Sequence, residues 1–531
     1  SRKLDIPTKD LINIPELNGG HFIETDLGRL MQVYHRRMTP MIEMTRRYGD
    51  PLMQNRIDEL EGLVDIEINK ALAKGDANKV VFLEKEKALQ MQAIQDLKEK
   101  ALNIYGMPPD PTAWSYRAIA FAKNWMVMAL MGKAAVAALP DMGRIVMATS
   151  MKEGLGAAFA KLGGAFKEFN LSAKEIKELG QACEMDLHSR YDGIMDLDHY
   201  YHGTSTLERF SEQGSNIMFL ANALGPYTDS MKRFAGAVLQ SNMIKAALKW
   251  SDEAWEKGSN VPFFDMGKIT KREKETFLRL GIDRDDARAI ALEWYSSGAL
   301  GPGKGTTYLH LSNASEWSDV VTRDKFRAAL AAEIDNAVIT PGPGDKLNFM
   351  SKPLGSFITQ FKGFGMAATN KTTMAAIQQR DSQVFHGLAS MVALGYIVDM
   401  IRSGPYDDRS LLSVDRFVQA VDYSAVFGIG FELNNMIEMV SGGVHGSPVG
   451  IRPALGIDAP FGDPSASRAM GTVGGPSIGL FLNLVNAYTD ETADTGDKIR
   501  AVRRLIPFNQ LIWWGWMVSR LQREAESVLE D

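Results

Sequence analysis

The stretch Lys346–Arg380, KLNFMSKPLGSFITQFKGFGMAATNKTTMAAIQQR, combines positive charge, aromatic residues and a helical period. It contains four phenylalanines and no acid, in a chain whose net charge is -6. Its five basic residues are Lys346, Lys352, Lys362, Lys371 and Arg380. The apolar spacing predicts a helix from Phe357 onward, with one face made of Phe357, Phe361, Phe364, Ala368 and Ala375. Such a segment is typical of contact with a membrane surface, nucleic acid or a partner helix, and a core helix with a solvated lysine edge has the same spacing.

The sequences on either side of this stretch differ sharply from it. Two Pro-Gly pairs, Pro341–Gly344, predict a loop that leads into the stretch. After it, Ser382–Val398 runs for 17 residues without a formal charge. This change from basic and aromatic to apolar predicts that 346–401 faces a membrane or a channel.

The composition excludes several classes of protein. With 45% hydrophobic and 23% charged residues among 531, the chain is neither disordered nor an ordinary multi-span membrane protein. The single cysteine, Cys183, excludes an internal disulfide. The slightly negative net charge does not indicate a nucleic-acid-binding surface over the whole protein, so any contact with nucleic acid would be local. Because the sequence begins with Ser1, we expect a piece of a longer protein or a processed product.

Helical periodicity and frequent Gly/Pro loops predict an all-α, extended multi-helical assembly with little or no β structure. A helix is expected over Asp26–Tyr48, followed by an antiparallel hairpin that turns at Gly75–Asn78. Each hairpin helix carries an apolar stripe: Ile57, Leu60, Val64, Ile68 and Ala71 on the first, and Leu89, Ala93, Leu97, Ala101 and Ile104 on the second.

Local signals also mark helix starts and one strand. Ser172 with Glu175, and Thr270 with Glu273, predict capping boxes. Residues 306–311 alternate enough for one short strand. Shifts in composition divide the chain into four predicted parts: 1–107 with the hairpin, 108–260 with a Met/Ala/Gly-rich stretch, 261–404 with the basic and aromatic stretch, and 405–531, a loop-rich region that ends in an Arg/Trp-rich helix.

The C-terminal region is the second predicted contact site. Arg500, Arg503 and Arg504 precede an uncharged run, Leu505–Ser519, that contains three indoles. The indoles are Trp513, Trp514 and Trp516. Arginines beside an indole cluster are typical of an interfacial anchor, and a tryptophan-rich surface packed on another subunit has the same composition.

No pattern of residues predicts catalysis, a cofactor or a metal. Glu24 lies too close to Gly28 to be the acid of a Gly-Leu-Met-Gln transglycosylase motif. His199 and His202 have no third ligand at a recognisable spacing. Around Lys304, Gly305 stands where a phosphate-binding loop requires Ser or Thr. The sequence therefore predicts no enzyme, and no catalytic, cofactor-binding or metal residue.

Several strings, in order along most of the chain, resemble the C-terminal portion of the large internal virion proteins of short-tailed phages. These proteins are ejected from the capsid together with the genome. The strings are Asp26–Asp50, Arg117–Ile145, Arg323–Gly344, Phe357–Asp381 and Arg503–Trp513.

The resemblance implies a helical homo-oligomer packed in the capsid core above the portal, together with other core and ejection proteins. After infection, such proteins form a conduit for double-stranded DNA across the host envelope and inner membrane. The longest members carry an N-terminal transglycosylase domain that this chain lacks, so the channel role is the one implied here. The alternatives are a peptidoglycan-cleaving virion enzyme, with Glu24 as its candidate acid, and a scaffold that only fills the capsid core.

Overall fold

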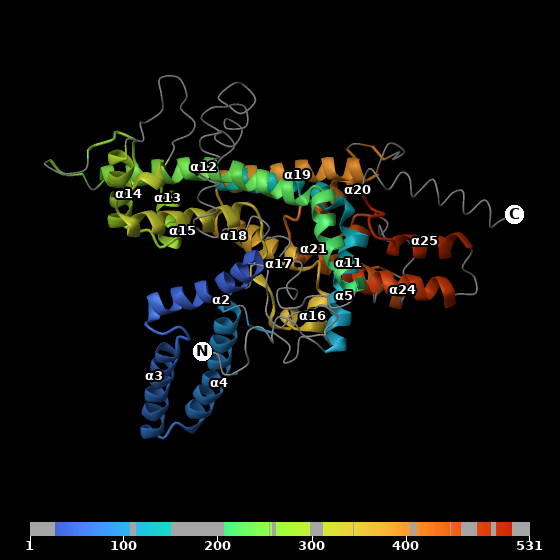
Figure 1. Ribbon diagram of the computed structural model, residues 1–531, viewed down its shortest axis with the longest axis horizontal. Coiled ribbons are helices and arrows are strands. Elements are labelled where there is room, and N and C mark those ends of the chain that lie inside the picture. Colours follow the sequence, from blue (N-terminus) through green and yellow to red (C-terminus); the bar gives the residue numbers. More distant parts are fainter. Residues whose placement is uncertain are drawn as a thin grey trace. The chain divides into compact units, whose positions relative to one another are not determined.

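The computed structural model describes the chain in thirteen ranges: 27–102, 104–106, 113–149, 206–253, 255–257, 262–297, 312–342, 345–403, 409–410, 412–445, 448–457, 475–489 and 495–511. Within them the regular structure is helical and contains no strand, so the all-α prediction is confirmed (Figure 1). The capping box at Ser172, the pair His199 and His202, the strand at 306–311 and the three C-terminal tryptophans lie outside the described residues.

The chain divides into two compact units. The first comprises Ser1–Pro111 and Leu347–Pro353, and the second comprises Thr112–Lys346 and Leu354–Asp531. The first predicted boundary, at residue 107, lies close to Pro111, where the longer segment of the first unit ends. The other three parts stay a prediction.

The first unit contains the predicted helical hairpin. Its elements are α2 (Leu27–Tyr48), α3 (Gln54–Ala73), α4 (Ala77–Ala101) and η6 (Asn348–Ser351). The expected helix ending at Tyr48 and the expected turn are both confirmed. In the turn Gly75 has a φ of 69°, which favours glycine, and the Asp76 carboxylate accepts a hydrogen bond from the Lys79 amide at 3.0 Å.

The second predicted stripe of the hairpin is wrong in its direction. Helix α4 packs on Val64, Ile68 and Ala71 of α3 through Val80 and Leu83. Leu89 and Leu97 of the predicted stripe are instead 58% and 64% exposed. Helix α4 carries more than one apolar row, so the spacing does not identify the row that packs. The packed face also includes the Lys87 amine, which pairs with the carboxylates of Glu61 and Asp65, and a search for apolar residues does not find such a contact.

The second unit is built around α12 (Leu224–Glu253), whose buried residues occur on all sides of the helix. Helices α13, α14 and α15 pack around it, and two tilted ring pairs join them: the Trp250 ring centroid lies 6.1 Å from that of Phe277, and the Trp317 centroid lies 5.0 Å from that of Phe326. The elements of this half are α5 (Trp114–Leu130), η2 (Met131–Lys133), α6 (Ala134–Ala137), η3 (Leu139–Asp141), α7 (Met142–Thr149), α11 (Thr206–Ala221), α12 (Leu224–Glu253), α13 (Lys271–Arg279), α14 (Arg284–Ser296), η4 (Ala314–Glu316) and α15 (Val320–Ala337).

Shorter helices follow in the rest of the second unit. They are α16 (Pro353–Ile358), α17 (Gly363–Ala368), the π-helical turn η7 (Thr369–Thr373), α18 (Met374–Gln379), α19 (Ser382–Ser403), α20 (Val414–Tyr423), α21 (Ile429–His445), α22 (Ile451–Ala454), α24 (Gly475–Thr489) and α25 (Thr495–Leu505). The predicted capping box at Thr270 and Glu273 is confirmed at the start of α13.

The helix predicted from Phe357 is not continuous, and that prediction is wrong. Helix α16 ends at Ile358, the chain turns, and helical structure resumes at Gly363. Phe361 packs in the cluster around Val127 and Met128, whereas Phe364 packs against Ile339 and Ala367. Because the two rings fill different clusters, the chain between them cannot follow one straight helix.

Helix α19 approaches its neighbours through glycines. A Cβ on Gly387 would lie 2.3 Å from Cβ of Met147 in α7, and one on Gly143 would lie 2.6 Å from the Met391 backbone nitrogen. Toward α20, a Cβ on Gly395 of α19 would lie 2.1 Å from the carbonyl oxygen of Ala420. These contacts bring the helix backbones too close for any side chain between them.

We expect Gly395→Ala to lower the free energy of unfolding by about 1–3 kcal/mol, because the new methyl group would overlap backbone atoms, which cannot adopt another rotamer as a side chain can. Urea unfolding followed by circular dichroism measures this. The matched control is Gly225→Ala in α12, where the new Cβ would have its nearest contact at an ordinary 3.6 Å. The control should keep its stability or gain up to about 1 kcal/mol. Equal stability of the two variants would contradict the role given to Gly395.

Candidate membrane-contact surface

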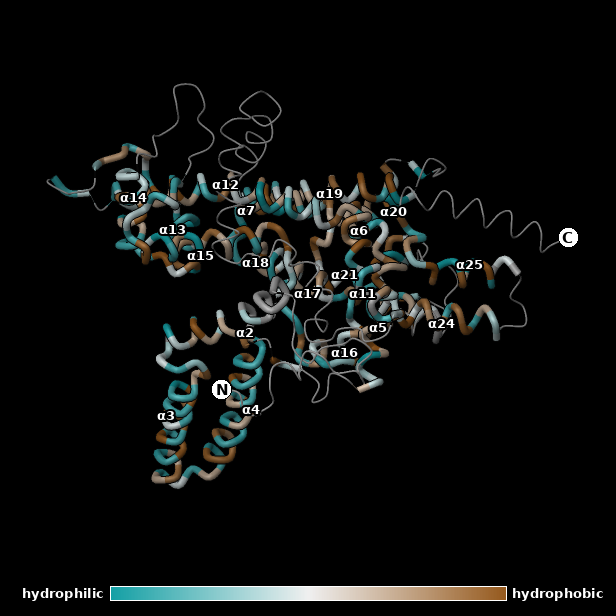
Figure 2. The backbone as a smooth tube through the Cα atoms, viewed as in Figure 1, coloured by the Kyte–Doolittle hydropathy of each residue, from teal (hydrophilic) through white to brown (hydrophobic). Residues whose placement is uncertain are grey.

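Helix α19 is the more apolar of the two described segments that pass a length and composition test for membrane spans. Two described segments, Trp114–Thr149 and Ser382–Ser403, are long and apolar enough to cross a membrane by length and composition. The core helix of a soluble protein passes the same test. In α19 only 33% of the apolar window is buried within the protein, compared with 56% for the other segment. Figure 2 shows the hydrophobic colouring along α19.

One face of α19 presents an apolar row to solvent. Phe385 is 70% exposed, and Ile397 and Ile401 are 42% and 47% exposed. The exposed alanines Ala389 and Ala393 fill the positions between them at intervals of four residues. We call these five residues the α19 row. The opposite face holds the glycine contacts, so the helix divides cleanly into a packed side and an open side.

The open side of α19 is continuous with aromatic surface on α20. The Tyr396 ring lies 6.4 Å from the Phe417 ring of α20, and Phe417 is 51% exposed. Val414, one turn earlier on α20, is 56% exposed. Contiguous exposed apolar surface of this kind marks a contact with a membrane or a partner.

An ionic cluster holds α19 to α20 beneath this surface. Asp399 of α19 is 1% exposed, and its carboxylate accepts hydrogen bonds from the guanidinium groups of Arg416 and Arg409, each at 3.1 Å. Arg409 also pairs with Asp415 at 3.0 Å. The one acid in α19 is therefore neutralised where it is buried, near the end of the helix.

The five basic residues of the central stretch do not share one surface. Lys346 is only 8% exposed. The Lys371 amine donates to the Thr340 carbonyl at 2.7 Å and to the Asp335 carbonyl at 3.2 Å, and burial lowers its pKa although Asp345 and Asp335 oppose the shift. Lys352 and Arg380 are exposed, and Lys362 is half-buried.

The surroundings of Lys362 and Arg380 show how each serves the fold. Burial raises the pKa of Glu432, and the positive charge of Lys362 partly offsets that rise. Arg380 has a φ of 47° and ends α18, so the chain can turn into α19, where the Asp381 carboxylate accepts a hydrogen bond from the Val384 amide at 2.9 Å. Contact of these basic residues, and of the half-buried Phe357, Phe361 and Phe364, with membrane or DNA stays a prediction.

The arginines of the C-terminal site lie on α25. Arg500 and Arg504 are exposed, and Arg503 is half-buried. The indole of Trp125 donates to the Leu505 carbonyl at 3.0 Å, and the Phe508 amide donates to the Met128 carbonyl at 2.8 Å, so the end of α25 is fixed to α5. The anchor role of this site stays a prediction.

Sequence reasoning located the charge-free run of α19 but missed its ionic cluster and the direction of its faces. The glycines at intervals of eight residues, Gly387 and Gly395, were the signal that could have identified the packed face. Among the described residues, no group of three or more His, Cys, Asp or Glu side chains is placed to hold a metal ion.

We expect Arg416→Met to lower the free energy of unfolding by about 1–3 kcal/mol, because the buried Asp399 carboxylate then keeps only the half-buried Arg409 as its charged partner. Chemical denaturation measures the loss. The double variant Arg416→Met/Asp399→Leu removes both buried charges and should recover much of it. If the double variant is no more stable than Arg416→Met, the loss comes from packing around Arg416 and not from the lost ion pair with Asp399.

Comparisons of the chain with protein-family models, curated proteins and solved structures give no match. Any function for the chain is therefore supported by its own residues: the α19 row, the ionic cluster beneath it, and the strings that resemble the internal virion proteins.

Proposed function

We propose that this chain is an internal virion protein of a short-tailed phage that leaves the capsid with the genome and forms part of a conduit across the host cell envelope. The observation that carries the proposal is the α19 row, an exposed apolar face on a helix long enough to cross a bilayer. The sequence strings that resemble ejection proteins supply the biological setting. In this proposal the protein is a homo-oligomer that acts with other core proteins, the portal, phage DNA and the host inner membrane.

A conduit subunit must be soluble in the virion and must contact lipid later. Helix α19 suits both states, because its glycine face is packed in the folded chain while its apolar row is already open. Its single acid is paired with Arg416, so burying this part of the helix in lipid would not expose a lone charge. The protein therefore has a segment that can bind a bilayer without first unfolding.

A scaffold that only fills the capsid core is the second candidate. Its supporting observation is the burial of Lys346 and Lys371, two basic residues of the central stretch, within the protein. Lysines engaged in this way stabilise the fold and are not available to lipid or DNA. The enzyme alternative depends on Glu24, which lies outside the described residues, and no observation favours it.

We expect the purified chain to float with anionic vesicles at low and high salt, because apolar insertion persists when charges are screened. Ala393→Asp places a carboxylate in the middle of the α19 row. An Asp at the centre of a membrane helix costs about 3 kcal/mol, so vesicle binding should fall about a hundredfold. Release of a trapped dye by the wild-type chain would extend the result from binding to permeabilisation.

The matched control is Ala328→Asp, the same change at an exposed alanine of α15. It should float like the wild-type chain, and circular dichroism checks that both variants are folded. Equal flotation of the two variants would show that α19 is not the contact. Flotation that disappears at high salt would reduce the contact to a basic surface, and no flotation of the wild-type chain at either salt would favour the scaffold.

A further inference from the structure

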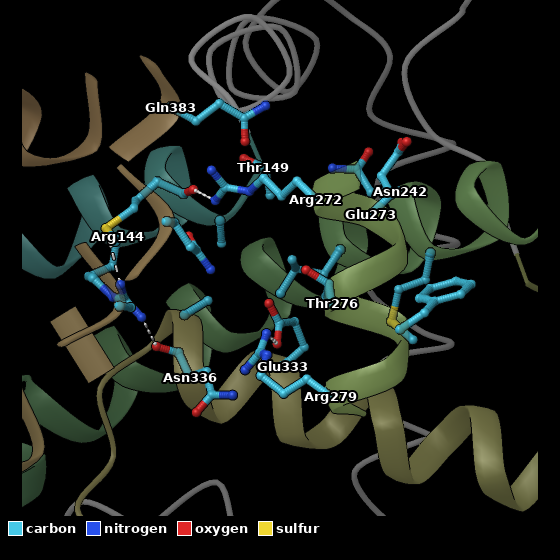
Figure 3. Close-up of a pocket in the computed structure, with 18 of the residues that line it drawn as sticks. Arg144, Thr149, Asn242, Arg272, Glu273, Thr276, Arg279, Glu333, Asn336 and Gln383 are labelled. Atoms are coloured by element: carbon cyan, nitrogen blue, oxygen red, sulfur yellow. Dashed lines mark hydrogen bonds and ion pairs between the residues drawn. The ribbon is translucent and has the colours of Figure 1, made fainter. Parts of the chain in front are cut away.

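The second unit contains a cavity of about 660 Å³, within the size range of small-molecule sites, lined by both polar and apolar atoms. Its walls come from α7, α12, α13, α15, the π-helical turn η7, α18 and α19 (Figure 3). Segments that are far apart in the sequence thus meet around one space. The cavity is separate from the α19 row, since the row lies on the exposed face of its helix.

Positive charge predominates in the cavity wall. Three acids, Glu273, Glu333 and Asp345, share the wall with six cationic side chains. The cationic residues are Arg144, Lys245, Lys249, Arg272, Arg279 and Lys371. Four of the six are paired with acids: Lys249 with Glu273 at 2.8 Å, Arg279 with Glu333 at 2.8 Å, Lys371 with Asp345 at 3.6 Å, and Arg272 with Asp381.

Arg144 is the most buried cation of the wall, and Glu333 and Asp141 offset its charge without forming an ion pair with it. It is 6% exposed and donates to the Asn336 carbonyl at 2.9 Å and to the Met147 thioether at 3.1 Å. Among the described residues it forms no ion pair, and its buried Nε has no hydrogen-bond partner. Burial lowers the pKa of Arg144 to about 10, so the group is still charged at neutral pH. A buried charge without a counter-ion is costly, and an anion in the cavity would reduce that cost.

The rest of the wall suits a ligand with a polar body and one apolar face. The side-chain amides of Asn242, Asn336 and Gln383 can donate and accept hydrogen bonds, and Phe277 and Met243 supply apolar wall. The π-helical turn η7 places Lys371 in the same wall, and π-turns within helices frequently occur at functional sites.

We propose that this cavity binds a small phosphate monoester, with the phosphate dianion beside Arg144 and the organic group between the amide and apolar walls. Guanidinium groups match phosphate oxygens in geometry, and the wall holds three of them, on Arg144, Arg272 and Arg279. This inference is independent of the proposed membrane function.

Titration calorimetry on the full chain at low salt tests the inference with three probes: AMP, glycerol phosphate and adenosine. We expect the two phosphate monoesters to bind and adenosine, which has no phosphate, to fail. AMP binding at least tenfold tighter than glycerol phosphate would identify a nucleotide, and equal binding would indicate a glycerol phosphate such as a lipid headgroup carries. Adenosine binding as tightly as AMP, or no binding of either ester, would overturn the inference.

Two pairs of variants locate the binding. Gln383→Glu adds a carboxylate to the cavity wall in the first turn of α19, where a negative charge is compatible with the helix. It should weaken AMP binding about tenfold by repulsion, whereas Gln419→Glu, outside the cavity wall, should not. Lys245→Gln should likewise weaken binding, and Lys268→Gln, at an exposed lysine outside the wall, should not. Equal affinities within both pairs would place the phosphate elsewhere.

Discussion

The arrangement of the second unit depends on how closely backbones approach α19 at its glycines. The missing side chains of Gly387 and Gly143 let α19 lie directly on α7, and Gly395 does the same on α20. This one constraint commits a face of α19 to the interior and leaves the α19 row outside. It also brings Asp399 within reach of Arg416, and it holds α7 where Arg144 enters the cavity wall.

Features set by neighbouring residues could be predicted from the sequence. The hairpin turn at Gly75, the capping box at Thr270 and the helix ending at Tyr48 depend on contacts within a few residues, so the local pattern carried enough information. The stripe on α4 failed for a physical reason: the helix has more than one apolar row, and spacing alone cannot say which row meets α3. The prediction of one helix from Phe357 was wrong because Phe361 and Phe364 pack in two different clusters.

The candidate sites depend on contacts between distant parts of the chain. Arg144 and the carbonyl that it contacts, on Asn336, are 192 residues apart in sequence, and no local pattern connects them. The charge-free run of α19 was visible in the sequence, but its open and packed faces follow from how α7 and α20 dock. Lys346 and Lys371 could not be placed from the sequence. A basic residue is expected at the surface, but in the fold Lys346 is buried and the Lys371 amine donates to a backbone carbonyl.

The glycine contacts also bury two methionines where α7 and α19 meet. Met391 is fully buried against Gly143, and Met147 is 2% exposed against Gly387. Oxidation to the sulfoxide converts an apolar side chain into a polar one, and burying a polar group without a new partner costs free energy. Oxidation of either methionine would therefore favour the state in which α19 and α7 have separated.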